Sequence, residues 1–267
     1  MTTATIITGA ALLGVMLCAW ITQRLTHNVG WVDVFWTFGT GLAGAGLAIV
    51  PISGAGIDAR QWLVAGLALV WAVRLGLYVA LRVASTPEDR RYVGLREDWG
   101  SSFQSKLFGF VFLQAPVALL LAVSIMLAAR SPGAGLRARD LAGAAILLIA
   151  IAGEGLADEQ MRRFKADPAN HGRICDQGLW SWSRHPNYLF EWFGWLAYPV
   201  ISWPLGAVYP WGWAAWVAPV LMYLVLDRGT GVPPLEAHML KSRGQAFADY
   251  QARVARFFPA PPRKHPS

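Results

Sequence analysis

The chain has 267 residues, of which 55% are apolar, with 14 Trp and a formal net charge of +7. Its apolar residues form long blocks rather than amphipathic spacing, which is the composition of a membrane protein and excludes an ordinary soluble domain. The two cysteines, Cys18 and Cys175, fall in different predicted segments, so no disulfide framework is expected.

Seven apolar segments come near the roughly 20 residues that a helix needs to cross a bilayer. In chain order they are 4–21, 31–49, 62–81, 107–129, 141–156, 188–203 and 210–226, the sixth being short. Residues 234–258 then alternate apolar and charged positions, which predicts an amphipathic interfacial helix or two short ones. The predicted fold class is therefore all-α: one integral-membrane domain over residues 1–267, built as a seven-transmembrane helix bundle.

The Lys and Arg residues indicate the orientation of the spans, since these residues collect on the cytoplasmic side. With the N-terminus outside, 18 of the 23 fall in cytoplasmic loops and the tail, 4 fall outside, and Arg74 lies within the third span. This bias predicts an outer N-terminus and a cytoplasmic C-terminus. It also makes the cytoplasmic face attractive to anionic headgroups or to an anionic ligand. A secretory signal is not expected, because residues 1–3 lack a basic n-region and no cleavage site ends the first block.

The segment GTGLAG, residues 39–44, matches the GxGxxG pattern of dinucleotide-binding turns. It lies inside an apolar span and no strand is predicted before it, so a nucleotide site is not expected here. The small residues Gly41 and Ala45 instead predict the close approach of another helix.

Polar residues inside the spans form sets at helical spacing. Ionisable residues there cost roughly 2.5–3.5 kcal/mol each and are functional candidates. The sets are Glu154 with Asp158, Asn187 with Glu191, Arg74 with Tyr78 and Arg82, and Asp33 between Trp31 and Trp36. In the first three sets, a spacing of four places the residues on one helix face. Structural pairing, for example of Arg74 with Asp33, is one interpretation; the number of sets favours a polar cavity open to the cytoplasm.

The loop before residue 188 combines cations with aromatic rings. It contains Arg162, Arg163, Lys165, Arg173 and Arg184, with Trp180 and Trp182 between them. Such a set suits a ligand with phosphates, ribose hydroxyls and a flat heterocycle. Membrane anchoring would explain the charges, but not Asn187 and Glu191, which are expected to point into the membrane. No metal site is predicted, because the five His residues lack the HxxxH spacing of ligands, and no serine nucleophile, because no Ser, His and Asp lie together in the predicted topology. A nucleic-acid surface is not predicted either, because the positive charge is divided among loops beneath the bilayer.

These segments resemble the steroid 5α-reductase family and its bacterial relatives, which are NADPH-dependent integral-membrane reductases. The resemblance lies in EGLADEQMRRFK, GLWSWSRHPNYLFEW and LKSRGQAFADYQARVARFFP, and in NVGWVDVFW and TPEDRRY for the bacterial branch. It implies a bundle in the bacterial inner membrane with NADPH on the cytoplasmic side. The implied reaction is hydride transfer to the β-carbon of a conjugated enone, with 5α-reduction of 3-oxo-Δ4 steroids. The expected partners are that lipophilic substrate and membrane lipids.

The resemblance, together with the RHPNY segment and the basic third loop, gives the predicted cofactor-binding residues. They are Arg91, Tyr92, Asp158, Lys165, Arg173, Trp180, Arg184, His185, Asn187, Tyr188, Glu191, Glu236 and Arg243. His185 either contacts the cofactor or caps the following helix. Pro186 fits the first turn of that helix, where its missing N–H is not needed.

The reaction places negative charge on the carbonyl oxygen, so the site needs a hydrogen-bond donor there. The Gln–Glu pair that animal-type members have on the second span is missing, and Asp33 is the only acid of that span. A desolvated Asp33 would stay protonated and serve as the donor. Asp33 and Tyr78 are the predicted catalytic residues. Asn28, Trp36 and Trp71 are the predicted substrate-binding residues, with Trp71 at the family's Tyr position.

A membrane methyltransferase of the isoprenylcysteine or phospholipid type is the alternative. It uses S-adenosylmethionine, and the chain resembles it in the RHPxY-like helix entry and a Glu in the tail. The seven-span length, the Glu154–Asp158 pair and the basic loop favour a ligand with several phosphates, which S-adenosylmethionine lacks. A transporter or non-enzymatic lipid-binding protein is a third reading, supported only by the buried charges.

Overall fold

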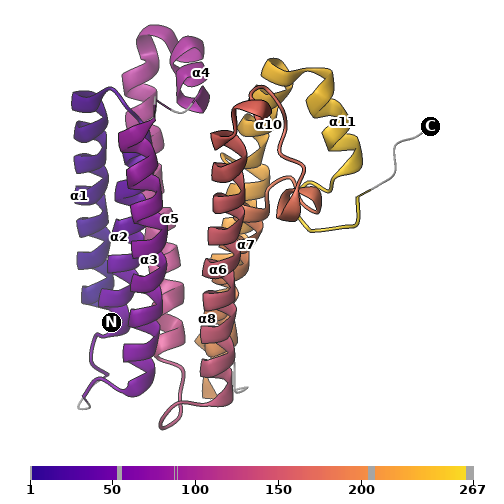
Figure 1. The fold of residues 1–267 in the computed structure, drawn as a ribbon. Coiled ribbons are helices and arrows are strands. Elements are labelled where there is room, and N and C mark those ends of the chain that lie inside the picture. The colour runs from indigo at the N-terminus through magenta and orange to yellow at the C-terminus, as the bar shows by residue number, and fades with distance from the viewer. Residues whose placement is uncertain (1, 53–55, 87, 89, 204–207, 263–267) are drawn as a thin grey trace. The chain divides into compact units, whose positions relative to one another are not determined.

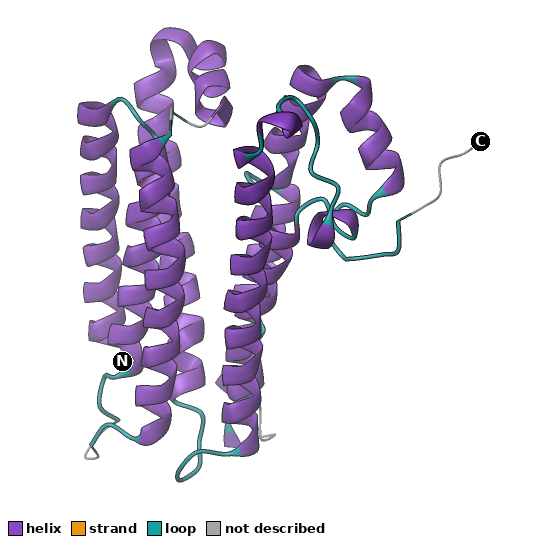
Figure 2. Cartoon of the chain, viewed as in Figure 1, coloured by secondary structure: helices purple, strands orange, loops and turns teal. Residues whose placement is uncertain are grey.

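The computed structural model describes residues 2–52, 56–86, 88, 90–203 and 208–262, without the side chains of residues 90, 91 and 95. Over these residues the regular secondary structure is helical, apart from an isolated parallel bridge between Ser183 and Ala255 (Figure 2). The all-α prediction is confirmed for this part of the chain. The chain divides into two compact units. Unit 1 comprises Met1–Ala145 and Leu196–Ala218, and unit 2 comprises Ile146–Trp195 and Pro219–Ser267.

Unit 1 is built on long helices that run side by side (Figure 1). They are α1 (Thr2–Thr26), α2 (Gly30–Ala48), α3 (Ala59–Ser85) and α5 (Phe103–Ala129), and α2 packs against each of the others. Asp58 begins α3 with a capping box, in which its side chain and that of Gln61 bond each other's backbone N–H. The shorter elements of the unit are α4 (Arg90–Trp99), η1 (Gly100–Ser102), α8 (Ala197–Ile201) and η5 (Pro210–Trp216).

Helix α2 approaches its neighbours closely at its glycines. A β-carbon on Gly41 would clash with Ala72 of α3, and one on Gly44 would clash with Ile125 of α5. The prediction that Gly41 permits close helix packing is therefore confirmed. The GTGLAG segment lies wholly within α2, where it forms a helix-packing surface.

A buried ion pair joins the start of α3 to the start of α6 (Ala138–Ala166) in unit 1. The guanidinium of Arg60 donates from Nε to Oδ1 of Asp140 at 2.9 Å and from Nη2 to Oδ2 at 3.0 Å. Its remaining hydrogen bonds go to the carbonyls of Ser131, Gly133 and Gly135 in the loop before α6. The pair therefore fixes this loop as well as the two helices.

Unit 2 contains α6 from residue 146 onward and the helices that follow the basic loop. These are α7 (Pro186–Trp195), α9 (Val217–Tyr223), the π-helical turn η6 (Leu224–Arg228), α10 (Val232–Arg243) and α11 (Gln245–Arg253). The 3-10 turns η2 (Pro168–Asn170) and η3 (Gly178–Ser181) lie in the loop itself. Helices α6 and α7 touch at Gly153, where a β-carbon would meet the ring of Phe190. The predicted tail thus forms the short helices α10 and α11.

Within the described residues, four segments are long and apolar enough to cross a membrane. They are Thr2–Thr26, Ala59–Ser85, Tyr92–Ala129 and Ala138–Ala166, which include the predicted first, third, fourth and fifth spans. The predicted second span is α2, a helix of 19 residues. These apolar helices fit the predicted membrane protein.

The predicted sixth and seventh spans are assembled from shorter elements. Helix α7 ends at Trp195, and Leu196 separates it from α8. Pro199 explains this break, because it has no N–H and its ring clashes with the carbonyl four residues earlier, on Trp195. The segment 210–226 changes from 3-10 to α to π geometry along its length. Seven spans therefore remain a prediction.

Candidate functional site

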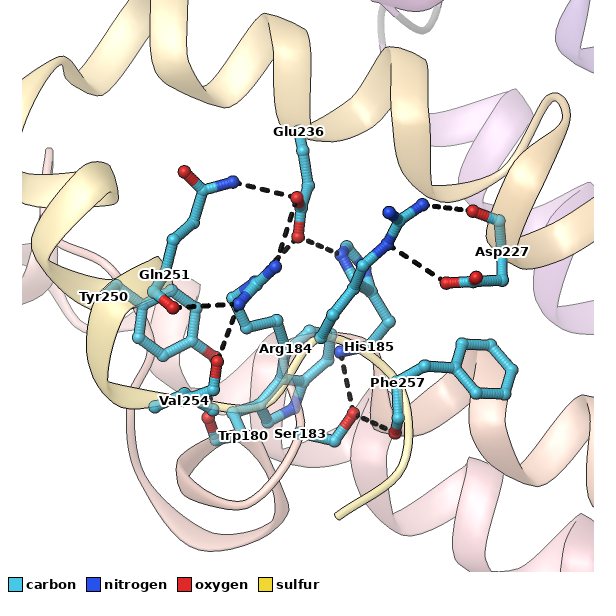
Figure 3. Close-up of polar contacts among 11 residues, drawn as sticks. Trp180, Ser183, Arg184, His185, Asp227, Glu236, Tyr250, Gln251, Val254 and Phe257 are labelled. Carbon is cyan, nitrogen blue, oxygen red and sulfur yellow. Dashed lines mark hydrogen bonds and ion pairs between the residues drawn. The ribbon is translucent and has the colours of Figure 1, made fainter. Parts of the chain in front are cut away.

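The residues just before α7 are tied to the C-terminal part of the chain (Figure 3). Ser183 Oγ donates to the carbonyl of Phe257 at 2.7 Å and accepts the N–H of His185 at 3.2 Å. The N–H of Arg184 donates to the carbonyl of Ala255 at 2.8 Å. Helix α7 therefore begins from an anchored segment.

Pro186 is the first residue of α7, as its sequence position predicts. The carbonyl of His185 accepts the N–H of Leu189 at 3.0 Å, which closes the first turn. The ring of Tyr188 stacks on His185, with ring centroids 5.8 Å apart and planes inclined by 14°. The backbone carbonyl of His185 thus accepts the first hydrogen bond of the helix, and its ring packs on Tyr188 of that helix.

Glu236 of α10 is the centre of a buried polar cluster that joins the two residues before α7 to α10 and α11 (Figure 3). Its Oε1 accepts Nε of Arg184 at 2.7 Å and lies 2.9 Å from Nε2 of His185. Its Oε2 accepts Nη2 of Arg184 at 3.3 Å and Nε2 of Gln251 at 2.8 Å. Nη1 of Arg184 donates to the carbonyls of Val254, at 2.6 Å, and Gln251, at 3.1 Å.

The protonation states of this cluster follow from its geometry. Burial raises the pKa of Glu236, but hydrogen bonds from His185 and Arg184 outweigh it and lower the pKa to about 2. Burial lowers the pKa of His185, against the opposite effect of the Glu236 carboxylate. Both pKa shifts agree with a neutral His185 imidazole that donates its Nε2–H to an ionised Glu236 carboxylate. The charge of the cluster is then that of one Arg–Glu pair.

A second ion pair holds the same C-terminal segment. Asp227, 3% exposed within the π-helical turn η6, has Oδ1 at 3.0 Å from Nε of Arg256 and Oδ2 at 2.9 Å from Nε of Arg228. Arg256 also donates to the backbone carbonyl of Asp227. Because Arg256 precedes Phe257, this pair and the Ser183 contact fix adjacent residues of the segment.

The acidic residues predicted on α6 and α7 are buried. Glu154 and Asp158 are each 6% exposed and Glu191 is 7% exposed. Glu191 accepts the indole N–H of Trp195 at 3.0 Å. Glu154 and Glu191 directly follow Gly153 and Phe190, the residues through which the two helices touch. Unit 2 therefore has carboxylates beside the contact of α6 and α7.

The remaining predicted residues of unit 2 lie nearer the surface or within the loop. Lys165, Arg173 and Arg243 are exposed, and Nη1 of Arg243 donates to the carbonyl of Gly172 at 2.9 Å. Asn187 is half-buried in the first turn of α7. Trp180 is buried; its indole N–H donates to the carbonyl of Ala157 on α6 at 3.0 Å, and its own carbonyl accepts Tyr250 Oη at 2.6 Å.

In unit 1, a hydrogen bond joins the predicted catalytic Asp33 to Tyr92. The hydroxyl of Tyr92, a buried residue on α4, donates to Oδ1 of Asp33 on α2 at 3.2 Å. Tyr92 was predicted to bind cofactor, and the structure pairs it with the predicted donor. The side chain of Arg91, its neighbour in the prediction, lies outside the described residues.

The start of α2, a few residues before Asp33, is held by polar contacts. Asn28 Oδ1 accepts the N–H of Gly30 at 2.9 Å, and its Nδ2 donates to the carbonyl of Val83 on α3 at 3.4 Å. Glu88 accepts the N–H of Val29 at 3.0 Å. Asn28, predicted to line the substrate pocket, therefore also anchors α2 to α3.

The predicted stripe on α3 is present. The guanidinium groups of Arg74 and Arg82 lie over the ring of Tyr78 from either side along the helix, 5.5 and 5.9 Å from its centroid. Trp71, one turn before Arg74, is 3% exposed. Trp36 of α2 packs against the apolar cluster that includes Tyr92. Cations thus flank Tyr78, the second predicted catalytic residue.

A sequence profile of DUF1295, described as a protein family of unknown function, matches residues 19–254. The chain belongs to the DUF1295 family. That family is related to steroid 5α-reductase-like proteins. Comparison with curated proteins and with solved structures gives no match. The matched region of this DUF1295 protein includes every predicted site residue, from Asn28 to Arg243.

The sequence did not single out Ser183, Asp227, Gln251 or Arg256 of this DUF1295 protein as site residues. Each contacts a partner distant in the chain or a backbone carbonyl, and neither kind of contact leaves a sequence pattern. Asp227 gave one signal, since it is an acid directly after the last apolar block and before a cation. A buried acid at a helix end favours a nearby cationic partner.

The chemistry that these groups offer differs between the units. Unit 2 combines exposed cations with buried carboxylates, while the donors of Arg184 are engaged by Glu236 and by backbone carbonyls. Unit 1 offers a carboxyl and a phenol joined by a hydrogen bond. The polar cavity expected from the sequence stays a prediction.

Proposed function

We propose that this chain is a membrane-embedded, NADPH-dependent reductase of the C=C bond of a conjugated enone, with 3-oxo-Δ4 steroids as the substrate class and the 5α product. The observation that carries the proposal is the Asp33–Tyr92 hydrogen bond within a bundle of mainly apolar helices. A developing enolate oxygen requires hydrogen-bond donors, and a neutral carboxyl and a phenol can both serve as such donors. The relation of DUF1295 to steroid 5α-reductase-like proteins supports the same reaction.

In this proposal Asp33, in its neutral form, donates to the substrate carbonyl, and Tyr92 holds the orientation of its carboxyl. Tyr78 is the second donor, and the flanking guanidinium groups of Arg74 and Arg82 favour developing negative charge near its hydroxyl. Asn28 fixes the helix that presents Asp33. Trp36 and Trp71 form apolar walls for the substrate.

The donor set of unit 2 fits NADPH. Exposed Lys165, Arg173 and Arg243 suit its phosphates, including the 2′-phosphate. Carboxylates such as Asp158 and Glu191, with the amide of Asn187, suit ribose hydroxyls and the nicotinamide amide. When bound, NADPH supplies the hydride. Arg184, His185 and Glu236 enter the proposal through their support of this region, because they bond one another.

The topology belongs to the proposal as well. Seven spans, an outer N-terminus and a cytoplasmic C-terminus are supported by the distribution of Lys and Arg and by the apolar helices. The bacterial inner membrane enters the proposal through the resemblance to the bacterial branch of the family. The cofactor side is then cytoplasmic, where NADPH is available to a membrane enzyme.

Thermal unfolding of the detergent-purified protein with NADPH, NADH or S-adenosylmethionine tests the cofactor. NADPH is expected to raise the unfolding midpoint most, because a ligand that binds the folded state stabilises it by mass action. Stabilisation by S-adenosylmethionine alone would refute the reductase proposal and favour the methyltransferase alternative.

Turnover of a 3-oxo-Δ4 steroid tests the assignment of the donor. Asp33→Asn and Tyr78→Phe are expected to lower kcat while the Kd for NADPH stays nearly unchanged. Asp98→Asn, an exposed position on α4, makes the same chemical change as the first variant and serves as its control. Full turnover in both donor variants would remove these residues from the proposed mechanism.

A further inference from the structure

We infer that Glu236 is a positioning residue that sets the start of α7, and with it Asn187 and Glu191. The inference rests on the proposed function in one respect, the assignment of those two residues to NADPH binding. Glu236 acts through Arg184 and His185, the residues directly before the helix.

The covalent path from the cluster to the polar face of α7 is short. His185, which lies 2.9 Å from Glu236, is separated from Asn187 only by Pro186. The ring of Pro186 fixes its φ angle, so this link has little freedom to absorb a shift of His185. The hydrogen bond from the Leu189 N–H to the His185 carbonyl also ties the position of His185 to the first turn of α7.

Both carboxylate oxygens of Glu236 already accept hydrogen bonds from side chains of the protein itself. Oε1 is bonded to Arg184 and His185, and Oε2 to Arg184 and Gln251. A carboxylate has about four lone-pair sites for hydrogen bonds, so these donors use its capacity. Glu236 therefore supports neighbouring residues and does not contact the cofactor.

Burial makes this support strong. Glu236 and Arg184 are each 9% exposed and His185 is 4% exposed. Loss of the carboxylate would leave Arg184 as a buried cation without its counter-charge, which destabilises the arrangement around it. Arg184 also donates to the carbonyls of Gln251 and Val254 at the end of α11, so the disturbance would extend to the C-terminal segment.

The test compares Glu236→Gln with Glu159→Gln by hydrogen–deuterium exchange of the ligand-free protein in detergent. Glu159 is a matched control, because its carboxylate also accepts several side-chain hydrogen bonds, here from Arg162 and Arg163, but at the surface of α6. Glu236→Gln is expected to speed exchange in residues 186–195 and 254–260 by about 10- to 100-fold, the range for losing a hydrogen bond to a charged group. Glu159→Gln should leave both segments unchanged.

The Kd for NADPH and kcat at saturating NADPH are measured on the same variants. Glu236→Gln is expected to raise the Kd about tenfold, with kcat changed less than about twofold, because the buried contacts that it weakens orient the cofactor-binding helix. If Glu236→Gln does not fold, Arg184→Met combined with Glu236→Met removes both charges and replaces it in the comparison.

Unchanged exchange of residues 186–195 would overturn the inference. So would a weaker affinity for NADPH without faster exchange, since that result assigns Glu236 to direct cofactor contact. Failure of the unaltered protein to bind NADPH would refute the proposed function instead, and the exchange of α7 would then decide the role of Glu236 alone.

Discussion

Replacement of Arg60 by Met is expected to destabilise unit 1 severely. Arg60 is 1% exposed and its partner Asp140 is fully buried. The substitution removes both hydrogen bonds to Asp140 and also the donors to the loop carbonyls of residues 131, 133 and 135. Breaking a buried pair by removing one partner costs about 3–5 kcal/mol, because the other charge stays buried without compensation. We expect a loss of that size in the free energy of unfolding.

Unfolding in mixed micelles, followed by circular dichroism, measures this loss. Arg139→Met is the control, since Arg139 is adjacent in sequence to Asp140 but half-buried, with its Nη2 bonded to the carbonyl of Pro132 at 2.8 Å. Arg60→Met combined with Asp140→Leu should be milder than the single variant, because no orphan charge remains. A single variant no worse than the Arg139 control, or a double variant no better than the single one, would refute this reasoning.

The other predictions concern helix packing, the proposed donor and pH. Gly41→Ala should lower the stability of unit 1 by about 1–3 kcal/mol through overpacking, whereas Gly46→Ala, which faces open space, should not. Tyr92→Phe should lower kcat about 2- to 10-fold, the range for losing a hydrogen bond between neutral groups, with the Kd for NADPH unchanged; an unaltered kcat would contradict its role. Unit 2 should lose stability as the pH falls below 6.5, because the unfolded chain then protonates His185 while burial keeps the imidazole neutral in the folded state. A further loss, of about 3 kcal/mol at most, should follow below pH 4.5 as Glu236 is protonated, and Glu236→Gln should abolish this second step in acid titrations of unfolding.

Much of the local structure could be predicted from the sequence. The apolar blocks predicted the long helices, and Gly41 predicted the close packing of α2. Pro186 predicted the start of α7, and the mixed tail predicted short helices after residue 231. These features depend on residues within one or two helical turns of each other, and the periodicity of the chain records such relations directly. The matched family also includes the segments on which the resemblance depends.

The tertiary structure alone decided how the predicted sixth and seventh spans are divided. Hydropathy averages over a window of residues and gives little weight to single prolines within it. Backbone hydrogen bonding, in contrast, is interrupted at each proline. The break after Trp195 and the change of helical geometry between residues 210 and 228 are therefore visible only in three dimensions.

The partners of the polar residues were also decided by the tertiary structure. The sequence placed Asp33 between Trp31 and Trp36, and it grouped Arg184 and His185 with neighbours in their own segment. In the fold, Arg184 and His185 bind Glu236, 52 and 51 residues away, and Asp33 accepts a hydrogen bond from Tyr92, 59 residues away. Helical periodicity determines which face of a helix a side chain occupies. Which distant group meets that face depends on the packing of whole helices, since a buried charge or donor is stable only where that packing supplies its partner.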